Sequence, residues 1–400
     1  FVVGFGIILY MLSAISIVPL TSQYIVSRLS LSLKVNNSTN ISVVNVSNAC
    51  NGSILGPEQI KIQKEASLLS LYYALTSGVA AIAINLILGP LSDFIGRRIL
   101  FIIPIVGLFL KCVITSLIVY FDLNLNLMYL ASAVDGLCGS YYAILVASFT
   151  YSADVTVPGK NRTVAIACME GCLAVAASVG ALSSGFLIKS TGYFYPVLMF
   201  AIAAAINLTL TFFCLPETLT EKKQPEKSPL YHIKKVFGFY FSNGSKRLLY
   251  SVLMGMFFFG VVVVLGRTSL ETIYQLGEPF CWNSVKIGYF GALRLTVQFS
   301  CSILSIKFLQ NYFKDEYISI LSIPVVGIIG SSTVPIARSL MSKMTPPEKQ
   351  GALFASIAIV ETVCNSASNS LYNLVYNATV EHFKGAVWFM MAGFCIIAIM

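Results

Sequence analysis

The stretch "GPLSDFIGRR", residues 89–98, places an acid and two arginines between two long apolar runs. The chain of 400 residues is 56% hydrophobic and 11% charged, which excludes an ordinary soluble domain. Its apolar residues come in blocks of about twenty, the length that a helix needs to cross the hydrocarbon core. Strands of outer-membrane barrels alternate polar and apolar residues, and these blocks do not. We therefore predict an all-α membrane protein.

The net charge of +9 does not point to nucleic acid. The basic residues fall mainly in short loops on one predicted side, as the positive-inside rule requires, so the partner is the lipid bilayer. The chain opens inside an apolar run at Phe1 and stops inside another at Met400, so we expect the natural chain to continue beyond both.

Hydropathy divides the chain into two sets of crossings joined by a polar, basic linker. We predict an N-terminal half over residues 1–215, a cytosolic linker over 216–247 and a C-terminal half over 248–400. The expected crossings lie near 1–26, 66–91, 98–120, 126–151, 163–188 and 192–214, then 248–274, 284–310, 324–342, 350–377 and 384–400.

The second half has one crossing too few for consistent sidedness. A single crossing at 324–342 would put "SKMTPPEKQ" outside and the sequon at Asn377 inside, against the positive-inside rule. One more crossing between about Tyr317 and Pro324 repairs both faults. We therefore expect twelve transmembrane helices, with most of a ninth missing from this chain; a natural protein of eleven helices is the alternative.

The same topology places the segment 31–64 outside as a glycosylated loop. It carries N-x-[ST] sequons, at which we predict glycosylation: Asn36, Asn37, Asn40, Asn45 and Asn51.

Two six-helix halves joined by a basic cytosolic loop are typical of secondary transporters with pseudo-symmetric repeats. In that layout "GPLSDFIGRR" lies in the cytosolic turn between the second and third helices. There it resembles the signature of the major facilitator superfamily, G-x-x-x-D-x-x-G-R-[RK]. Gly89 and Gly96 match its glycines, which allow a tight turn and close helix approach, and Arg98 closes it.

The other charges of the motif predict a gate. We expect Asp93 to face the start of the helix near Gln350 and Gly351, whose free N–H groups favour an anion. We expect Arg97 to pair with Asp154 in "YSADVT". Such a cluster would hold the two halves together on the cytosolic side. The alternative is that these charges only set topology; "LPETL", residues 215–219, matches a second superfamily motif more weakly.

Several further stretches resemble the proton-coupled folate transporter and its lysosomal steroid-conjugate and bile-acid relatives. They include "PLTSQY" (Pro19–Tyr24), "FCWNSVKIGY" (Phe280–Tyr289), "RSLMSK" (Arg338–Lys343) and "EKQGALFASIA" (Glu348–Ala358). The resemblance implies proton-coupled transport of an organic anion. It also implies a disulfide between Cys50 and Cys281, the two cysteines that topology places in loops on the non-cytosolic side; two free thiols are the alternative.

The resemblance assigns roles to two ionisable residues. Glu170 matches the acid that the family uses for proton coupling. A carboxyl in a dry cavity has a raised pKa and can therefore load and release a proton. A structural hydrogen bond is the alternative. Arg338 matches an arginine linked to proton and substrate binding, with snorkelling to the interface as the alternative. Glu361 stands where the lysosomal branch has "ET".

Other charges at membrane depth are functional hypotheses by default. Arg294 is a candidate anchor for an anionic substrate. Arg267 and Glu271 are four apart and are expected to pair with each other. For Asp135, close helix packing and a substrate contact are both open. Aromatic residues that could stack on a ring system are Tyr141, Tyr142, Tyr289 and Phe290.

Two departures weaken folate as the substrate. The folate branch has a histidine where Val264 stands here and an acid where Ser140 stands. Neither His232 nor His382 has metal-ligand spacing, and no nucleotide-binding or nucleophile motif is present, so we expect no metal, no cofactor other than the proton, and no enzyme activity.

The leading hypothesis is a proton-coupled symporter that moves an organic anion (a folate or pterin, a steroid conjugate or a bile acid) towards the cytosol by alternating access. A proton-independent facilitator and a receptor or sensor with the transporter fold are the alternatives. We expect a monomer or weak homo-oligomer in the plasma membrane or an endolysosomal membrane.

Overall fold

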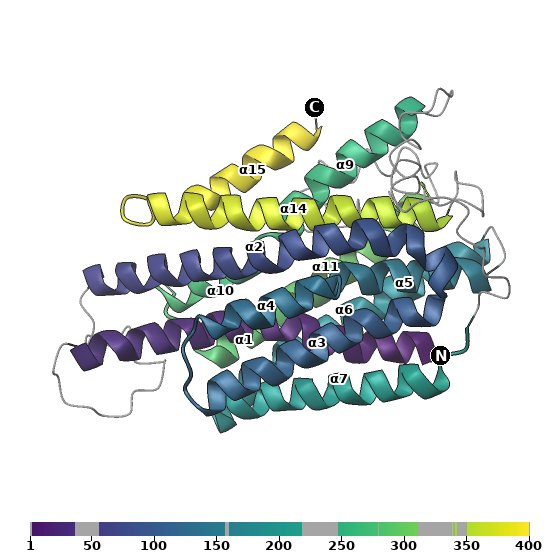
Figure 1. The fold of residues 1–400 in the computed structure, drawn as a ribbon. Helices are drawn as coiled ribbons and strands as arrows, with labels where there is room; N and C mark the ends of the chain where they lie inside the picture. Colours follow the sequence, from purple (N-terminus) through teal and green to yellow (C-terminus); the bar gives the residue numbers. More distant parts are fainter. Residues whose placement is uncertain are drawn as a thin grey trace.

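The computed structural model describes residues 2–36, 56–156, 160–217, 247–278, 280–310, 338, 341 and 350–399. All regular elements among these residues are helices, and the long ones run side by side across the molecule (Figure 1). Seven spans in this part of the chain are long and apolar enough to cross a membrane. Most of the run predicted at 324–342, and the site of the missing crossing, lie outside the described residues, so the number of helices stays a prediction.

The helices of the first half follow the predicted runs but extend into the loop that was expected at 31–64. The first, second, third, fifth and sixth crossings are α1 (Val2–Asn36), α2 (Gly56–Ile95), α3 (Arg97–Tyr120), α6 (Lys160–Thr191) and α7 (Phe194–Cys214). Thus α1 and α2 take up both ends of the loop expected at 31–64. Straight-chain polar residues such as those of "EQIKIQKE" have good helix propensity, so the helix continues past the apolar run.

One consequence concerns the predicted modification sites. Asn36 is the last residue of α1, whereas the other four sequons and Cys50 lie outside the described residues.

The fourth crossing is broken in the middle, which the sequence analysis missed. It consists of α4 (Leu127–Leu137) and α5 (Ser140–Val155). Gly139 has φ 83° and Ser140 φ 52°, so the chain leaves the right-handed helical region at both residues. Asn85 of α2 donates a hydrogen bond to the Gly139 carbonyl at 3.1 Å. A break at membrane depth is tolerated where protein groups take up the freed backbone, and Asn85 does this here.

The seventh crossing is broken too, into α9 (Arg247–Leu265) and α10 (Thr268–Leu276). Gly266 and Arg267 form the turn between them. A Cβ on Gly266 would lie 2.1 Å from Ser368 Oγ, so the turn packs closely on the helix that carries Ser368. That helix is α14 (Gln350–Thr379).

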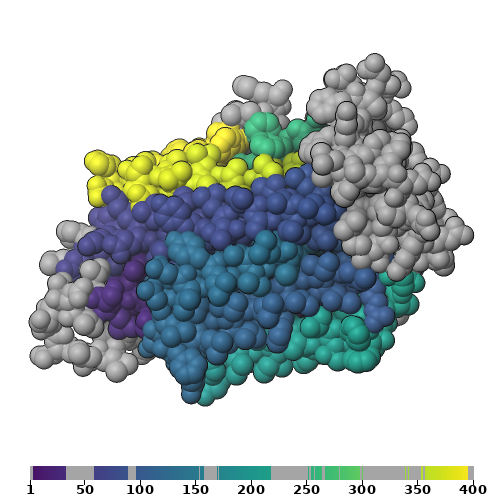
Figure 2. Space-filling model, viewed as in Figure 1, coloured from purple at the N-terminus to yellow at the C-terminus, as the bar shows by residue number. Residues whose placement is uncertain are grey.

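The two halves meet along two pairs of helices. α14 packs along α2, and their surfaces adjoin along the molecule (Figure 2), while α11 (Ser284–Gln310) packs along α6. Where α6 and α11 meet, a Cβ on Gly185 of α6 would lie 2.6 Å from the carbonyl oxygen of Ser284 and 3.1 Å from Gly288 Cα. Backbone therefore touches backbone there, which glycine alone permits. α15 (Ala386–Ile399) lies outside this core, against α9 and α14.

Candidate substrate cavity and gates

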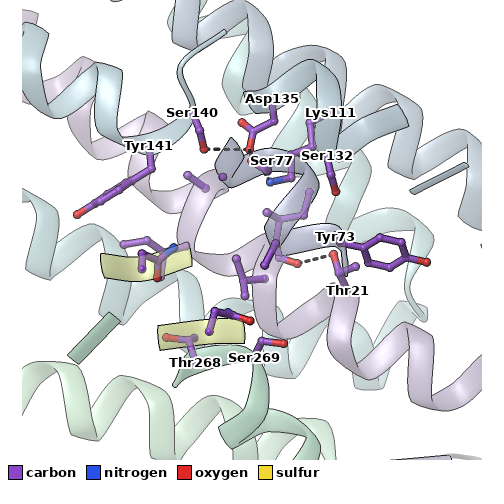
Figure 3. Close-up of a pocket in the computed structure, with 18 of the residues that line it drawn as sticks. Thr21, Tyr73, Ser77, Lys111, Ser132, Asp135, Ser140, Tyr141, Thr268 and Ser269 are labelled. Carbon is purple, nitrogen blue, oxygen red and sulfur yellow. Dashed lines mark hydrogen bonds and ion pairs between the residues drawn. The ribbon is translucent and has the colours of Figure 1, made fainter. Parts of the chain in front are cut away.

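A cavity of about 390 Å³ lies between the halves, lined by α1 to α6 from the first and α10, α11 and α14 from the second. Its volume is within the range of small-molecule sites, about 300 to 1,000 Å³. The wall is mostly apolar but carries hydroxyl and amide groups (Figure 3), among them Thr21, Ser77, Ser132, Thr268, Ser269 and Asn365.

An ion pair from the first half stands in the cavity wall. Lys111 Nζ of α3 lies 2.9 Å from Asp135 Oδ2 of α4. The same oxygen accepts hydrogen bonds from Ser140 Oγ at 3.0 Å and Ser77 Oγ at 3.3 Å. Because Asp135 comes just before the helix break, Ser140 can turn back onto it. Asp135 therefore bonds to two neighbouring helices and also lines the cavity, so a substrate contact stays a hypothesis.

Lys111 was not among the residues that sequence analysis selected. A lone lysine in the apolar run "GLFLKCVIT" was the available signal, since an ionisable group at membrane depth needs a reason to be there.

A second ion pair comes from the other half. Arg294 Nη1 of α11 lies 2.7 Å from Glu271 Oε2 of α10, and Arg294 lines the cavity. The expected pairing of Glu271 with Arg267 is therefore wrong. Arg267 is the N-cap residue of α10, and its carbonyl accepts the Glu271 N–H at 2.8 Å, so the two residues lie one helical turn apart. The Glu271 carboxylate nevertheless pairs with Arg294 of the neighbouring helix α11.

The candidate aromatic residues separate into two groups. Tyr141 and Tyr142 line the cavity. Tyr289 does not: it is 55% exposed and packs on Phe186. Tyr289 and Arg294 are five positions apart, which is about 140° around an α-helix, so the two side chains point in different directions. Phe290, one turn from Arg294, lines a smaller neighbouring pocket with it.

Arg338 and Glu361 form a buried ion pair just beyond the cavity. Their side chains are 4% and 3% exposed, and neither lines the cavity. The Arg338 guanidinium lies over the rings of Phe149 at 5.0 Å and Phe257 at 5.7 Å. This burial excludes the alternative that Arg338 snorkels to the interface. Phe149 of α5 also stacks on Phe354 of α14, with ring centroids 5.5 Å apart. Aromatic contacts therefore join the two halves next to the Arg338–Glu361 pair.

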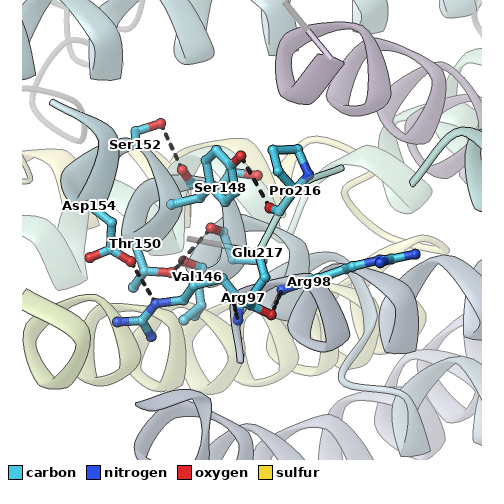
Figure 4. A network of polar contacts seen from close by, with 11 residues as sticks. Arg97, Arg98, Val146, Ser148, Thr150, Ser152, Asp154, Pro216 and Glu217 are labelled. Atoms are coloured by element: carbon cyan, nitrogen blue, oxygen red, sulfur yellow. Dashed lines mark hydrogen bonds and ion pairs between the residues drawn. The ribbon is translucent and has the colours of Figure 1, made fainter. Parts of the chain in front are cut away.

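Residues of the "GPLSDFIGRR" motif form a polar cluster at one end of the helices, which we call the motif end (Figure 4). Arg97 Nε lies 2.8 Å from Asp154 Oδ2, so the structure brings together the pair expected from the sequence. The Glu217 carboxylate accepts hydrogen bonds from the backbone N–H groups of Arg97 at 2.7 Å and Arg98 at 3.3 Å. Arg98 also lies over the ring of Phe212, at 5.1 Å.

Glu217 caps the first turn of α3, a role that the sequence analysis did not give it. An acid at a helix N-terminus meets free N–H groups and the positive end of the helix dipole. Gly96 leads into this turn with φ 108°, and a Cβ there would lie 2.4 Å from Glu217 Oε2. The available signal was the acid of "LPETL", which follows the sixth crossing on the same side as the motif.

Parts of the predicted gate lie outside the described side chains. They are Gly89, Asp93 and the Gln350–Gly351 helix start. The expected coupling acid Glu170, which is not part of the gate, also lies outside the described side chains. The described partners of Arg97 lie in α5 and just after α7, so this part of the motif joins helices within the first half.

At the opposite end, which we call the loop end, α2 and α14 are joined by direct bonds between the halves. Tyr376 Oη donates to Gln63 Oε1 at 2.9 Å, and Asn377 Nδ2 donates to the Lys64 carbonyl at 3.2 Å. Lys64 Nζ lies 2.6 Å from Glu381 Oε1. The hydrogen bond and charge of Lys64 lower the pKa of the exposed Glu381 carboxyl.

Cys281 is disulfide-bonded. Its predicted partner Cys50 lies outside the described residues, so the pairing itself stays a prediction.

Comparisons with known proteins agree on the family. The model of the Major Facilitator Superfamily matches residues 3–369. The lysosomal proton-coupled steroid conjugate and bile acid symporter of Rattus norvegicus is 30% identical, over 98% of this chain and 91% of its own length. The proton-coupled folate transporter of Rattus norvegicus is 28% identical, over 95% of this chain and 86% of its own.

Solved structures share the fold at low sequence identity. The human organic anion transporter MFSD10 matches with a TM-score of 0.69 at 15% identity, covering 100% of this chain and 97% of that one. A D-xylose-proton symporter matches with a TM-score of 0.62 at 13% identity, covering 99% and 95%. The chain is thus a multi-pass membrane protein of a transporter family, not an enzyme, and it belongs to the Major Facilitator Superfamily, in the group of the proton-coupled folate transporter and the lysosomal steroid conjugate and bile acid symporters.

Proposed function

We propose that the protein is a proton-coupled symporter that carries an organic anion towards the cytosol by alternating access. The observation that carries this proposal is the cavity between the halves, with a cationic side chain on either side of it and an aromatic, mainly apolar lining. A cation at membrane depth is costly unless a carboxylate or an anionic ligand compensates it. Such a lining suits an amphipathic acid, and the relatives named above transport folate, steroid conjugates or bile acids.

For proton coupling we propose Glu170, on the resemblance of "ACMEGCLAV" to the family. We propose that Arg338 and Glu361 act later in the transport cycle, when the anion leaves the cavity. Their pair lies beyond the cavity, next to the Phe149–Phe354 stack. Protonation of Glu361 would release the Arg338 guanidinium to an anion that leaves the cavity towards the motif end.

The test is uptake by proteoliposomes at about pH 5.5 and 7.4, on either side of the reference pKa of histidine. Labelled folates, sterol sulfates and bile acids form the panel. We expect one class to accumulate under an inward proton gradient. The Glu170→Gln variant should lose accumulation and keep exchange. Unchanged accumulation in this variant would indicate a proton-independent facilitator. If the wild-type protein moves none of these anions, a receptor with the transporter fold is the better description.

We also propose a disulfide between Cys50 and Cys281 and glycosylation of the sequons in the loop expected at 31–64. A Cys50–Cys281 bond would tie the first half to the second at the loop end. Peptide mapping without reduction should recover one cross-linked peptide that contains both cysteines. Glycosidase treatment should release mass from the segment with the five sequons, and recovery of those peptides unmodified from mammalian cells would contradict the proposal.

A further inference from the structure

Two ion pairs with the same design border the cavity, one from each half. Lys111, Asp135 and Arg294 line the cavity, and Glu271 lines the smaller pocket next to it. In each pair the cation is more exposed than its carboxylate. The side chains of Lys111 and Asp135 are 22% and 4% exposed, and those of Arg294 and Glu271 are 20% and 12% exposed. A molecule in the cavity therefore meets the ammonium and the guanidinium before it meets the acids.

The two pairs belong to opposite walls. Figure 3 shows Lys111 and Asp135 on the side of the cavity away from Thr268 and Ser269, the first residues of α10. The acid of the second pair, Glu271, is on that same short helix. An anionic group held by one cation thus leaves the other cation for a separate group.

Each half also supplies a buried hydroxyl without a described hydrogen-bond partner. Tyr10 Oη of α1 and Ser366 Oγ of α14 line the cavity, and neither has a partner among the residues that the structure describes. The two residues are 1% and 7% exposed. A buried hydroxyl without a partner is costly, so a ligand oxygen or a water is expected to accept from each. Tyr10 lines the same cavity as Lys111 and Asp135.

We propose that Lys111, with Asp135 as its counter-ion in the empty site, is an anion anchor that complements Arg294, so that the cavity is built for an amphipathic ligand with an anionic group at each end. This proposal rests on the proposed function. On binding, each end of the ligand becomes a further partner of its cation, while Asp135 keeps the hydrogen bonds from Ser77 and Ser140. An ion pair that only joins α3 to α4 is the competing explanation, and it predicts no preference for doubly charged ligands.

The test measures binding by the purified full chain, using oestradiol monosulfate and oestradiol disulfate as probes. The variant is Lys111→Met with Asp135→Asn, because removing both charges leaves no unpaired buried ion. Wild type should bind the disulfate more tightly. The variant should bind it about 10- to 100-fold more weakly, since each tenfold is about 1.4 kcal/mol, and the monosulfate within about threefold of wild type. Arg294→Met with Glu271→Gln should give the same pattern, because either variant keeps one anchor.

The matched control is Arg28→Met with Asp122→Asn, which removes an ion pair that lies outside the cavity and should change neither affinity. Equal weakening of both probes by the Lys111 variant, or no preference for the disulfate in wild type, would overturn the anchor. Failure of the proposed function looks different: selective binding of the disulfate persists, but no proton-driven uptake occurs.

Discussion

The polar contacts that the structure describes at the two ends of the molecule join different helices. At the motif end, the described polar contacts of Arg97 and Glu217 join α3, α5 and the end of α7, all within the first half. At the loop end, Gln63 and Lys64 of α2 bond directly to α14 of the second half. The described contacts of the motif cluster therefore tie α3 to its neighbours in the first half, whereas the described loop-end bonds must break if that end is to open.

The largest expected effect comes from Gly96→Ala, which tests the motif end. Alanine would have to adopt φ 108° with its Cβ 2.4 Å from Glu217 Oε2. We expect a loss of stability of about 1 to 3 kcal/mol, seen as a lower thermal midpoint of the purified protein. Gly192→Ala is the control: Gly192 has φ 78° but nothing within 4 Å of its Cβ position, so it reports backbone strain alone. Equal losses would mean that contact with Glu217 is unimportant.

Glu217→Ala should have the next largest effect. It removes the acceptor of two N–H groups at the start of α3 and should cost about 1 to 2 kcal/mol, as for a lost helix cap. Thermal unfolding is again the measurement. Glu278→Gln is the control, because the Glu278 side chain is 55% exposed and only approaches Lys384 at 3.4 Å. A midpoint unchanged in the Glu217 variant would show that the cluster does not stabilise the first half.

At the loop end, Tyr376→Phe should shift a conformational equilibrium. The lost bond to Gln63 is worth about 1 kcal/mol, roughly a fivefold change in population. We expect a cysteine placed in the cavity wall, Ser22→Cys, to react faster with an impermeant maleimide added from this side. Tyr372→Phe, one turn away, is the control, because its hydroxyl donates to the Val262 carbonyl within the second half. Faster labelling in both variants would mean general loosening rather than opening of the loop end.

The smallest effect is expected at Lys64 and Glu381. Since Lys64 lowers the pKa of the Glu381 carboxyl, the ionised pair is present above the ordinary glutamate pKa and is lost only as the pH falls through the lowered value. Labelling of the same cavity cysteine should therefore change with pH between about 5.5 and 7.4 to the same extent in wild type and in Glu381→Gln. A pH response that disappears in the variant would make this pair a proton sensor.

Sequence reasoning predicted the features that depend on local pattern. The apolar runs gave the helices, and "GPLSDFIGRR" gave the superfamily and the partnership of Arg97 with Asp154. The breaks at Gly139 and Gly266 were missed because hydropathy averages over a window and is insensitive to backbone direction. Glu271 pairs with Arg294 of another helix although Arg267 lies one helical turn away, and helix periodicity alone does not give such a tertiary contact.

The cavity was harder to predict for a related reason. Which face of a helix points inward depends on its neighbours, so Tyr141 and Tyr289 looked equivalent in the sequence although one alone lines the cavity. Polar residues of α14 at helical spacing, Glu361, Asn365 and Asn369, were a usable signal, because such a row in an apolar run marks an inward face.

The glycine contact between α6 and α11 has a consequence for how the halves could move. Gly185 and Gly288 bring backbone against backbone, with no side chain between them. This contact contains no side-chain rotamers that must change and no interdigitating side chains. We therefore expect one half to tilt on the other about this point at little cost in free energy. A methyl group at either glycine would force the two helices apart at this point.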